Sequence, residues 1–231
     1  EQLVIDEELG DVEQPDLGIG TWVVLTLAQH GTPDQIERWI RPSLTGAQRW
    51  CQLFSEPNAG SDAAAITTRG TRVDGGWLVN GQKVWTSDAH NSNRGLATVR
   101  TDPDAAKHAG VTMMAIDMKA KGVEVRPLRE LTGENMFNEV FFDDVFVPDE
   151  DVVGQVNQGW AVARATLGNE RVSIGSNRSQ LDTVGGQELV ELAARCAPGD
   201  LCPGASQRHH ASQSRAAPPL NMRHVMRAIA G

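Results

Sequence analysis

The sequence predicts an α+β protein in which a helical region, a middle antiparallel β domain and a second helical region follow one another. Two observations support this order. From residue 49 to residue 153 the chain has short runs rich in β-branched and aromatic residues between glycine-containing turns, as antiparallel sheets do. On both sides of this stretch, apolar residues recur at helical spacing. With 40% hydrophobic and 22% charged residues, the composition is globular and excludes collagen, coiled coil and wholesale disorder.

A helix start signal marks the first region, residues 1–48. Thr32 can cap a helix, Pro33 suits the first helical position, and Gln35 stands where a capping box requires it. The apolar residues of the helix that follows are Ile36, Trp39 and Ile40. We therefore expect residues 1–48 to be mainly helical.

The middle region, residues 49–153, reads as a compact antiparallel sheet. Hairpin-type turns are expected at Asp74-Gly75-Gly76 and at Asn80-Gly81. The expected strands are the runs Leu78-Val79, Lys83–Thr86, Val111–Ile116, Val123–Val125 and Val140–Val147.

The third region, residues 154–195, is expected to be helical, and residues 196–231 an irregular tail. Glu170 and Arg171 stand at the two edges of an apolar helix face, which is formed by Trp160, Ala163, Leu167 and Ile174. The tail contains four arginines, one aspartate and four prolines without sustained periodicity, so its composition differs from that of the preceding chain.

Charge and composition also exclude classes of partner. The 231 residues include 21 lysines and arginines against 30 aspartates and glutamates, a net charge of -9, so a nucleic-acid surface is not expected. No apolar run approaches the ~18 residues of a membrane span. The first residues lack a signal segment, so we expect a cytoplasmic protein. The cysteines and histidines do not have the spacing of zinc ligands, so we expect no metal.

The stretch from Trp50 to Asp62 is the first that suggests chemistry. A β-like run ends in a flexible turn with two hydroxyls, so backbone N–H groups and Ser55 or Ser61 can approach an anionic or heteroaromatic ligand. A turn of serine, glycine and aspartate that caps its own backbone is the alternative. The residues alone do not decide between the two.

A second stretch, Asn80–Ser87, contains an indole two residues from a hydroxyl. Strand alternation places Trp85 and Ser87 on the same face, where a planar ring can stack while the hydroxyl addresses its edge. The alternative is that Trp85 is a core residue, as most tryptophans are. Periodicity does not separate these interpretations.

These stretches and several others closely resemble the acyl-CoA dehydrogenase family over roughly residues 20–175. The resemblance rests on motifs in one collinear order: His30-Gly31-Thr32-Pro33, Phe54–Asp62, Asn80–Ser87, Arg100–Asp104, Gly122–Leu128, Phe137–Pro148 and Gly159–Arg171. It implies the family's fold, in which an N-terminal helical domain, a middle β domain and a C-terminal four-helix bundle hold FAD between them. Residues 1–48 would then end the first domain, residues 49–153 form the middle domain, and residues 154–195 begin the bundle.

The resemblance also implies site residues. Those expected to contact FAD are Gln52, Leu53, Phe54, Ser55, Ser61, Trp85, Thr86 and Ser87. Those expected to contact the acyl-CoA are Ser61, Gly168, Asn169, Glu170 and Arg171. In the family, the hydroxyl at the position of Ser87 approaches the flavin nitrogen that accepts hydride, and the indole at the position of Trp85 covers one flavin face.

The implied reaction is α,β-dehydrogenation of an acyl-CoA thioester, with hydride transfer to FAD and onward electron transfer to an electron-transferring flavoprotein. Most members carry the carboxylate base late in the chain. The isovaleryl-CoA and long-chain branches carry it on the first long C-terminal helix, where Glu170 aligns. Partial desolvation at the edge of an apolar face suits a general base. The alternative for Glu170 is an ion pair with Arg171 or Arg164.

The resemblance weakens after about Ile174 and ends after Cys196, so we expect a truncated member of the family. In the family the bundle buries the apolar face of the third region and builds a homo- or hetero-oligomer. We therefore expect this face to be exposed here. Two alternatives to an active dehydrogenase stay open: a catalytically silent flavin- or CoA-binding subunit of a mixed oligomer, and a non-functional fragment.

Overall fold

The computed structural model describes residues 17–176. The predicted tail at 196–231, residues 177–195 of the predicted third region and residues 1–16 of the first region lie outside this range. The described helices are α2 (Gly20–His30), α3 (Pro33–Leu44) and α4 (Gly159–Ser176), with the 3-10 turns η1 (Ala89–Asn91) and η2 (Asp149–Asp151). The strands are β1 (Trp50–Leu53), β2 (Arg69–Val73), β3 (Gly76–Ser87), β4 (Arg94–Arg100), β5 (Val111–Asp117), β6 (Val123–Pro127), β7 (Phe137–Pro148) and β8 (Val152–Val153).

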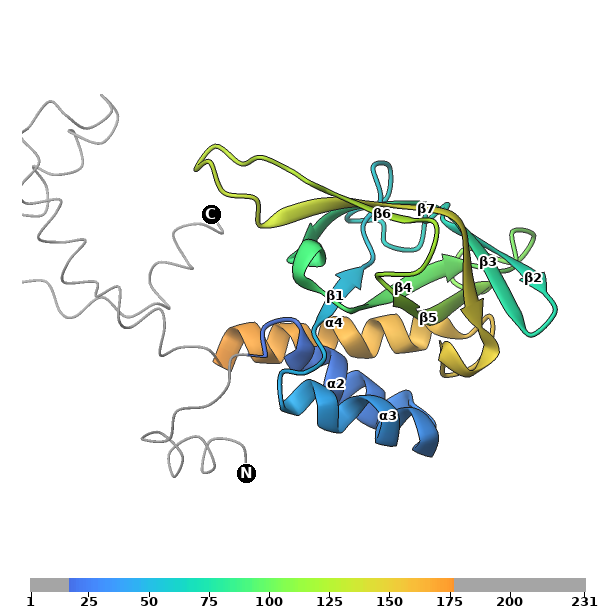
Figure 1. Cartoon of the computed structure of the whole chain (residues 1–231). Coiled ribbons are helices and arrows are strands. Elements are labelled where there is room, and N and C mark those ends of the chain that lie inside the picture. Colours follow the sequence, from blue (N-terminus) through green and yellow to red (C-terminus); the bar gives the residue numbers. More distant parts are fainter. Residues whose placement is uncertain (1–16, 177–231) are drawn as a thin grey trace, which may run out of the picture. The chain divides into compact units, whose positions relative to one another are not determined.

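The strands form one sheet in the order β6-β7-β3-β2-β4-β5-β8, with β1 beside β4 (Figure 1). The predicted α+β class is confirmed. Neighbouring strands pair antiparallel, except that β1 and the start of β2 pair with β4 in parallel. Strand β1 can be parallel because the chain enters it from the helical region and leaves it through a long loop, so no hairpin joins it to β4.

Of the two predicted hairpin turns, the structure has the first as a turn, whereas the second is a bulge within a strand. Gly75 has φ +71 in the turn between β2 and β3, as expected. Gly81 instead lies inside β3, at a register shift between Val79 and Gly81, with φ +149. A Cβ at position 81 would stand 2.6 Å from the Thr68 hydroxyl oxygen, so the glycine permits a close contact within a bulged strand. The two expected runs at 78–79 and 83–86 are therefore one strand.

Helix α3 begins with the expected capping box. The Gln35 backbone N–H donates to the Thr32 hydroxyl at 3.2 Å, and the Thr32 backbone N–H donates to Gln35 Oε1 at 3.1 Å. The Gln35 amide nitrogen also donates to the carbonyl oxygens of Glu150 at 2.7 Å and Val152 at 2.8 Å. The residue that completes the cap thus also attaches α3 to the β region.

The central strands place apolar side chains on both faces of the sheet, and these side chains belong to two separate cores. On β5, Met114 and Ile116 belong to the first core, whereas Met113 and Ala115 belong to the second. The first core lies among the strands. The second lies between the sheet and the helices, which run along one side of it (Figure 1).

The expectation that the apolar face of α4 is exposed is wrong for most of its length. Ala163 is 1% exposed, and Trp160 and Leu167 pack against the second core. The Thr26 hydroxyl of α2 also donates to the Thr166 hydroxyl at 3.3 Å. Only Ile174, at 60% exposed, fits the expectation. The sheet and α2 bury this face, which the sequence pattern had left without a partner inside the chain.

Candidate functional site

The two predicted cofactor segments, residues 52–55 (the first segment) and residues 85–87 (the second segment), lie side by side. They come from β1 and β3, which are not neighbours in the sheet. They meet because the Val84 backbone N–H donates to the Ser55 carbonyl oxygen at 2.9 Å. In the first segment Leu53 and Phe54 are buried, so only Gln52 and Ser55 have side chains that are partly exposed.

A buried ion pair lies directly beneath this junction. Lys83 Nζ is 2.8 Å from Glu56 Oε1, and both side chains are buried. Glu56 also accepts from the backbone N–H groups of Thr67 at 2.6 Å and Thr68 at 3.0 Å. Glu56 therefore holds the turn after β1 and is not directed toward a ligand.

Both members of the pair are charged at neutral pH. Burial alone would raise the pKa of Glu56, but the charge and hydrogen bond of Lys83 outweigh it and lower this pKa to about 2. Burial lowers the pKa of Lys83 to about 8, against the opposing effect of Glu56. Lys83 was not among the expected site residues. Its neighbours Gln82 and Thr86 are polar as well, so no local pattern marked it as buried.

Trp85 is not a core residue, so one of the two interpretations of its stretch is excluded. Its side chain is 64% exposed, and its backbone has φ +58 at a register shift between Lys83 and Thr86. The Phe137 ring packs edge-on against the indole, with 6.1 Å between ring centroids. A bulky residue in left-handed backbone is strained, and such strain concentrates at functional sites. The indole is thus held outward with a face open to solvent.

The other two residues of the second segment differ in exposure. Thr86 is buried and Ser87 is partly exposed. The Thr86 hydroxyl is buried and has no hydrogen-bond partner in the part of the chain that the structure describes. The buried Asn138 amide holds the segment by donating to the Thr86 carbonyl oxygen at 3.0 Å. No local pattern distinguished Asn138, because its role depends on the pairing of β3 with β7.

Glu170 on α4 reaches the first segment. The Gln52 amide nitrogen donates to Glu170 Oε2 at 3.1 Å, and the Trp22 indole N–H donates to Gln52 Oε1 at 2.7 Å. Glu170 is partly buried, and among residues 17–176 it makes no ion pair with Arg164 or Arg171.

The remaining predicted substrate residues lie beside Glu170 on α4, except Ser61. Asn169 contacts α2, where its amide nitrogen lies 3.3 Å from both the Thr26 hydroxyl and Gln29 Oε1. Gly168 and Arg171 are exposed on α4, and Ser61 is exposed on the loop after β1. Gly168, Arg171 and Ser61 are therefore available to a ligand.

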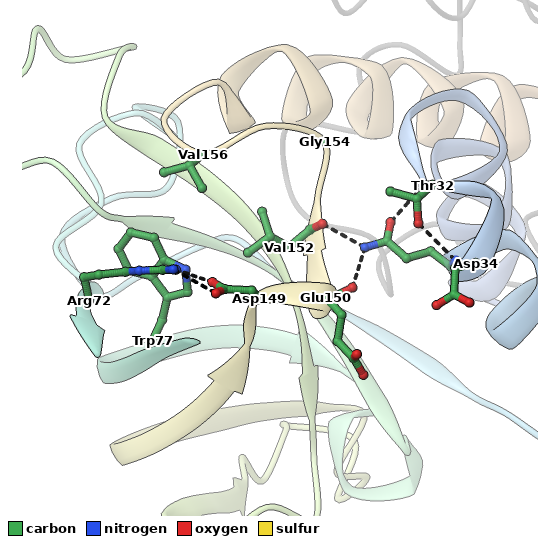
Figure 2. A pocket seen from close by; sticks show the side chains of 10 residues that line it. Thr32, Asp34, Arg72, Trp77, Asp149, Glu150, Val152, Gly154 and Val156 are labelled. Atoms are coloured by element: carbon green, nitrogen blue, oxygen red, sulfur yellow. Dashed lines mark hydrogen bonds and ion pairs between the residues drawn. The ribbon is translucent and has the colours of Figure 1, made fainter. Parts of the chain in front are cut away.

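A separate cavity of about 760 Å³ lies between the start of α3 and the β2–β3 hairpin. Figure 2 shows Thr32 on one side and Arg72 with Asp149 on the other. Arg72 stacks over Trp77 at 5.0 Å and pairs with Asp149. None of the predicted site residues lines this cavity.

No cluster of three or more histidine, cysteine, aspartate or glutamate side chains within residues 17–176 could hold a metal ion. No helix in the same range is both long and apolar enough to cross a bilayer.

Comparison with known proteins identifies the class. Residues 51–145 match the acyl-CoA dehydrogenase middle domain. The chain is 58% identical to the acyl-CoA dehydrogenase FadE34 of Mycobacterium tuberculosis over 75% of its own length and 25% of that protein. It is 39% identical to the acyl-CoA dehydrogenase IpdE1 of Mycolicibacterium smegmatis, over 76% of this chain and 47% of that one.

Solved structures agree. The G363A variant of the Tcur3481-Tcur3483 steroid acyl-CoA dehydrogenase superposes with a TM-score of 0.67 and 27% identity, covering 80% of this chain and 52% of that one. The ChsE4-ChsE5 complex of Mycobacterium tuberculosis gives a TM-score of 0.62 and 29% identity, covering 73% and 44%.

The fold and the paired segments thus define a middle domain of the acyl-CoA dehydrogenase type with helices packed on it. The chain belongs to the acyl-CoA dehydrogenase family. It spans between a quarter and a half of the length of these two curated relatives.

Proposed function

We propose that the chain acts in the FAD-dependent α,β-dehydrogenation of an acyl-CoA thioester, with electrons passed on to an electron-transferring flavoprotein. Family membership supports the reaction class. The observation that carries the proposal is the hydrogen bond between Gln52 and Glu170 at 3.1 Å, because it joins the candidate base to the first cofactor segment.

The exposed groups around the two segments fit a flavin. The indole of Trp85, 64% exposed, offers a flat apolar face on which a planar heteroaromatic ring can stack. The partly exposed hydroxyls of Ser55 and Ser87 would supply hydrogen bonds to polar ring edges. When bound, FAD would supply the hydride acceptor, which no side chain can provide.

Glu170 would remove the α-proton. The Gln52 amide nitrogen donates to the carboxylate oxygen Oε2, and the indole N–H of Trp22 donates to the Gln52 amide oxygen. These two hydrogen bonds would fix the orientation of the Glu170 carboxylate. We assign proton abstraction to Oε1. The exposed Gly168, Arg171 and Ser61 would border the path of the CoA thioester.

A second candidate is a catalytically silent flavin- or CoA-binding subunit that completes a relative. One observation favours it: a solved neighbour at 29% identity is a complex of two differently named proteins, ChsE4 and ChsE5. In this case the chain would bind flavin or CoA without a competent base of its own.

The visible spectrum of the purified chain with added FAD tests the proposal. Acyl-CoA thioesters, including one with a steroid acyl group, are then added anaerobically. We expect the flavin bands to bleach with at least one thioester. A bound flavin that stays oxidised throughout favours the silent subunit, and the absence of bound flavin favours a non-functional fragment.

Glu170→Gln tests the role of the base. Loss of a general base costs a factor of about 100 or more, so we expect flavin reduction to slow at least that much while FAD still binds. The control is Glu37→Gln, which neutralises an exposed carboxylate on α3 and should reduce flavin at the normal rate. Near-normal reduction by Glu170→Gln would remove Glu170 from the mechanism.

A further inference from the structure

The proposed site depends on two strands that share no β ladder. Strand β1 pairs with β4, whereas β3 pairs with β2 and β7. The backbone bond from Val84 to Ser55 is short, at 2.9 Å, but one bond does not set the register of two segments. Some other group must therefore keep the first and second segments at a constant separation.

Lys83 is the group that spans this gap. Its ammonium nitrogen, on β3, donates to the Phe54 carbonyl oxygen at 3.2 Å, in the first segment. It also donates to Glu56 Oε1 at 2.8 Å and to the Thr98 carbonyl oxygen of β4 at 2.8 Å. The three protons of one ammonium are thus directed at the first segment, at the turn behind it and at the strand that pairs with β1.

Net stabilisation is a poor explanation for a pair in this position. Removing two charges from water costs about as much as their attraction returns, and apolar residues of similar volume often serve the fold equally well. Lys83 is 0% exposed and Glu56 is 4% exposed, so the cost of desolvation is large here. Directional hydrogen bonds to three separate elements provide what an apolar side chain does not, which is a defined relative placement.

Lys83 also lies directly before the strained part of β3. The register shift falls between Lys83 and Thr86, and Trp85 within it has φ +58 and an outward indole. Such backbone persists only when its surroundings over-determine it. Asn138 holds the far side of the bulge through the Thr86 carbonyl oxygen, and Lys83 holds the near side.

We propose that Lys83 and Glu56 are positioning residues that set the separation and register of the first and second segments, and thereby the stacking place offered by Trp85. This inference rests on the proposed function for its flavin consequence. The pair acts through the backbone of residues 54–56 and 84–87 and does not itself touch the cofactor.

The experiment compares Lys83→Met with a control variant that loses a similar amount of stability but lies outside the two segments. Methionine keeps the length of the lysine side chain without its donors. The control, Val153→Ala, removes methyl groups from a fully buried residue on β8, at the opposite end of the sheet order from β6. Both are studied in the full chain, at a temperature where each is folded by circular dichroism.

The first readout needs no ligand. Hydrogen exchange of the backbone amides of residues 84–87 reports directly on the junction, because Val84 donates to Ser55. We expect exchange at these amides to be at least about tenfold faster in Lys83→Met than in Val153→Ala. The second readout is FAD: we expect an affinity at least about tenfold weaker and an altered visible circular dichroism of the bound flavin in Lys83→Met only.

Equal exchange and equal flavin properties in the two variants would overturn the proposal, because a merely structural pair would act only through stability. If Lys83→Met does not fold, Glu56→Gln replaces it. That variant keeps an oxygen near Lys83 but loses the charge, and the same comparison with Val153→Ala applies. If the unmodified chain binds no FAD, the proposed function fails. The exchange data then still decide whether the pair positions the segments.

Discussion

Lys83 and Glu56 show at the scale of single residues how a buried charge can be tolerated. Both charged groups of the pair are hydrogen-bonded several times. The lysine donates to two carbonyl oxygens and a carboxylate, and the carboxylate accepts from Thr67 and Thr68 as well. A lone charge at this depth would be expelled or neutralised. The pair therefore links stability to pH.

The sign of that link follows from Glu56. Its pKa is lowered from the ordinary 4.5 to about 2, so the folded state binds this proton more weakly than the unfolded chain does. The contribution to stability is complete above about pH 4.5 and is lost as the pH falls through about 2. Relative to the protonated form of Glu56, its size is about 3 kcal/mol.

We expect Glu56→Gln to remove this pH dependence. The difference in unfolding free energy between the unmodified chain and the variant should shrink by about 3 kcal/mol between pH 6 and pH 2. Urea unfolding at several pH values measures it. Glu37→Gln is the control, because that carboxylate is exposed on α3. A difference that stays constant with pH would contradict the assignment to Glu56.

At the scale of elements, the start of α3 shows local sequence and tertiary contact acting together. The capping box satisfies two backbone groups within the helix, and the Gln35 side chain also reaches the carbonyl oxygens of Glu150 and Val152. The helix is thus positioned at its first turn, next to the cavity of Figure 2.

Thr32→Ala should destabilise the chain by about 1 kcal/mol, because the Gln35 backbone N–H loses its acceptor. Thr32→Ser keeps the hydroxyl and should cost much less. Thermal or urea unfolding of both variants measures the two changes in free energy. Equal losses in the two variants would show that the Thr32 methyl group, and not the cap, is responsible.

At the scale of the whole described structure, α4 is a docked helix. Its inward residues join the second core with α2 and the sheet, and the same docking places Glu170 against Gln52. Stability and the geometry of the candidate site therefore depend on one interface.

The same substitution, valine to alanine, at two positions on α4 tests whether this helix is docked. Val162 is 2% exposed and Val172 is 64% exposed. We expect Val162→Ala to lower the unfolding free energy by about 2 kcal/mol, from lost apolar burial and the cavity left behind. Val172→Ala should change it by less than about 0.5 kcal/mol. Chemical unfolding compares them, and equal effects would mean that α4 is not docked as described.

The features that the sequence predicted correctly are those encoded over a few residues. The capping box at 32–35, the turn at Gly75, and the change from helix to strand and back all depend on local geometry and side-chain type. The family resemblance supplied the segments and their expected ligands, and it correctly assigned the chain to a family.

Sequence by itself thus determined the fold class, the family and the candidate residues. Only the tertiary structure decided that the apolar face of α4 is buried, that Trp85 is exposed on strained backbone, and that Glu170 meets Gln52. It also brought Lys83 to Phe54, 29 residues away. The physical reason is that local spacing shows which side of a helix or strand is apolar, whereas the partner of that side depends on long-range packing.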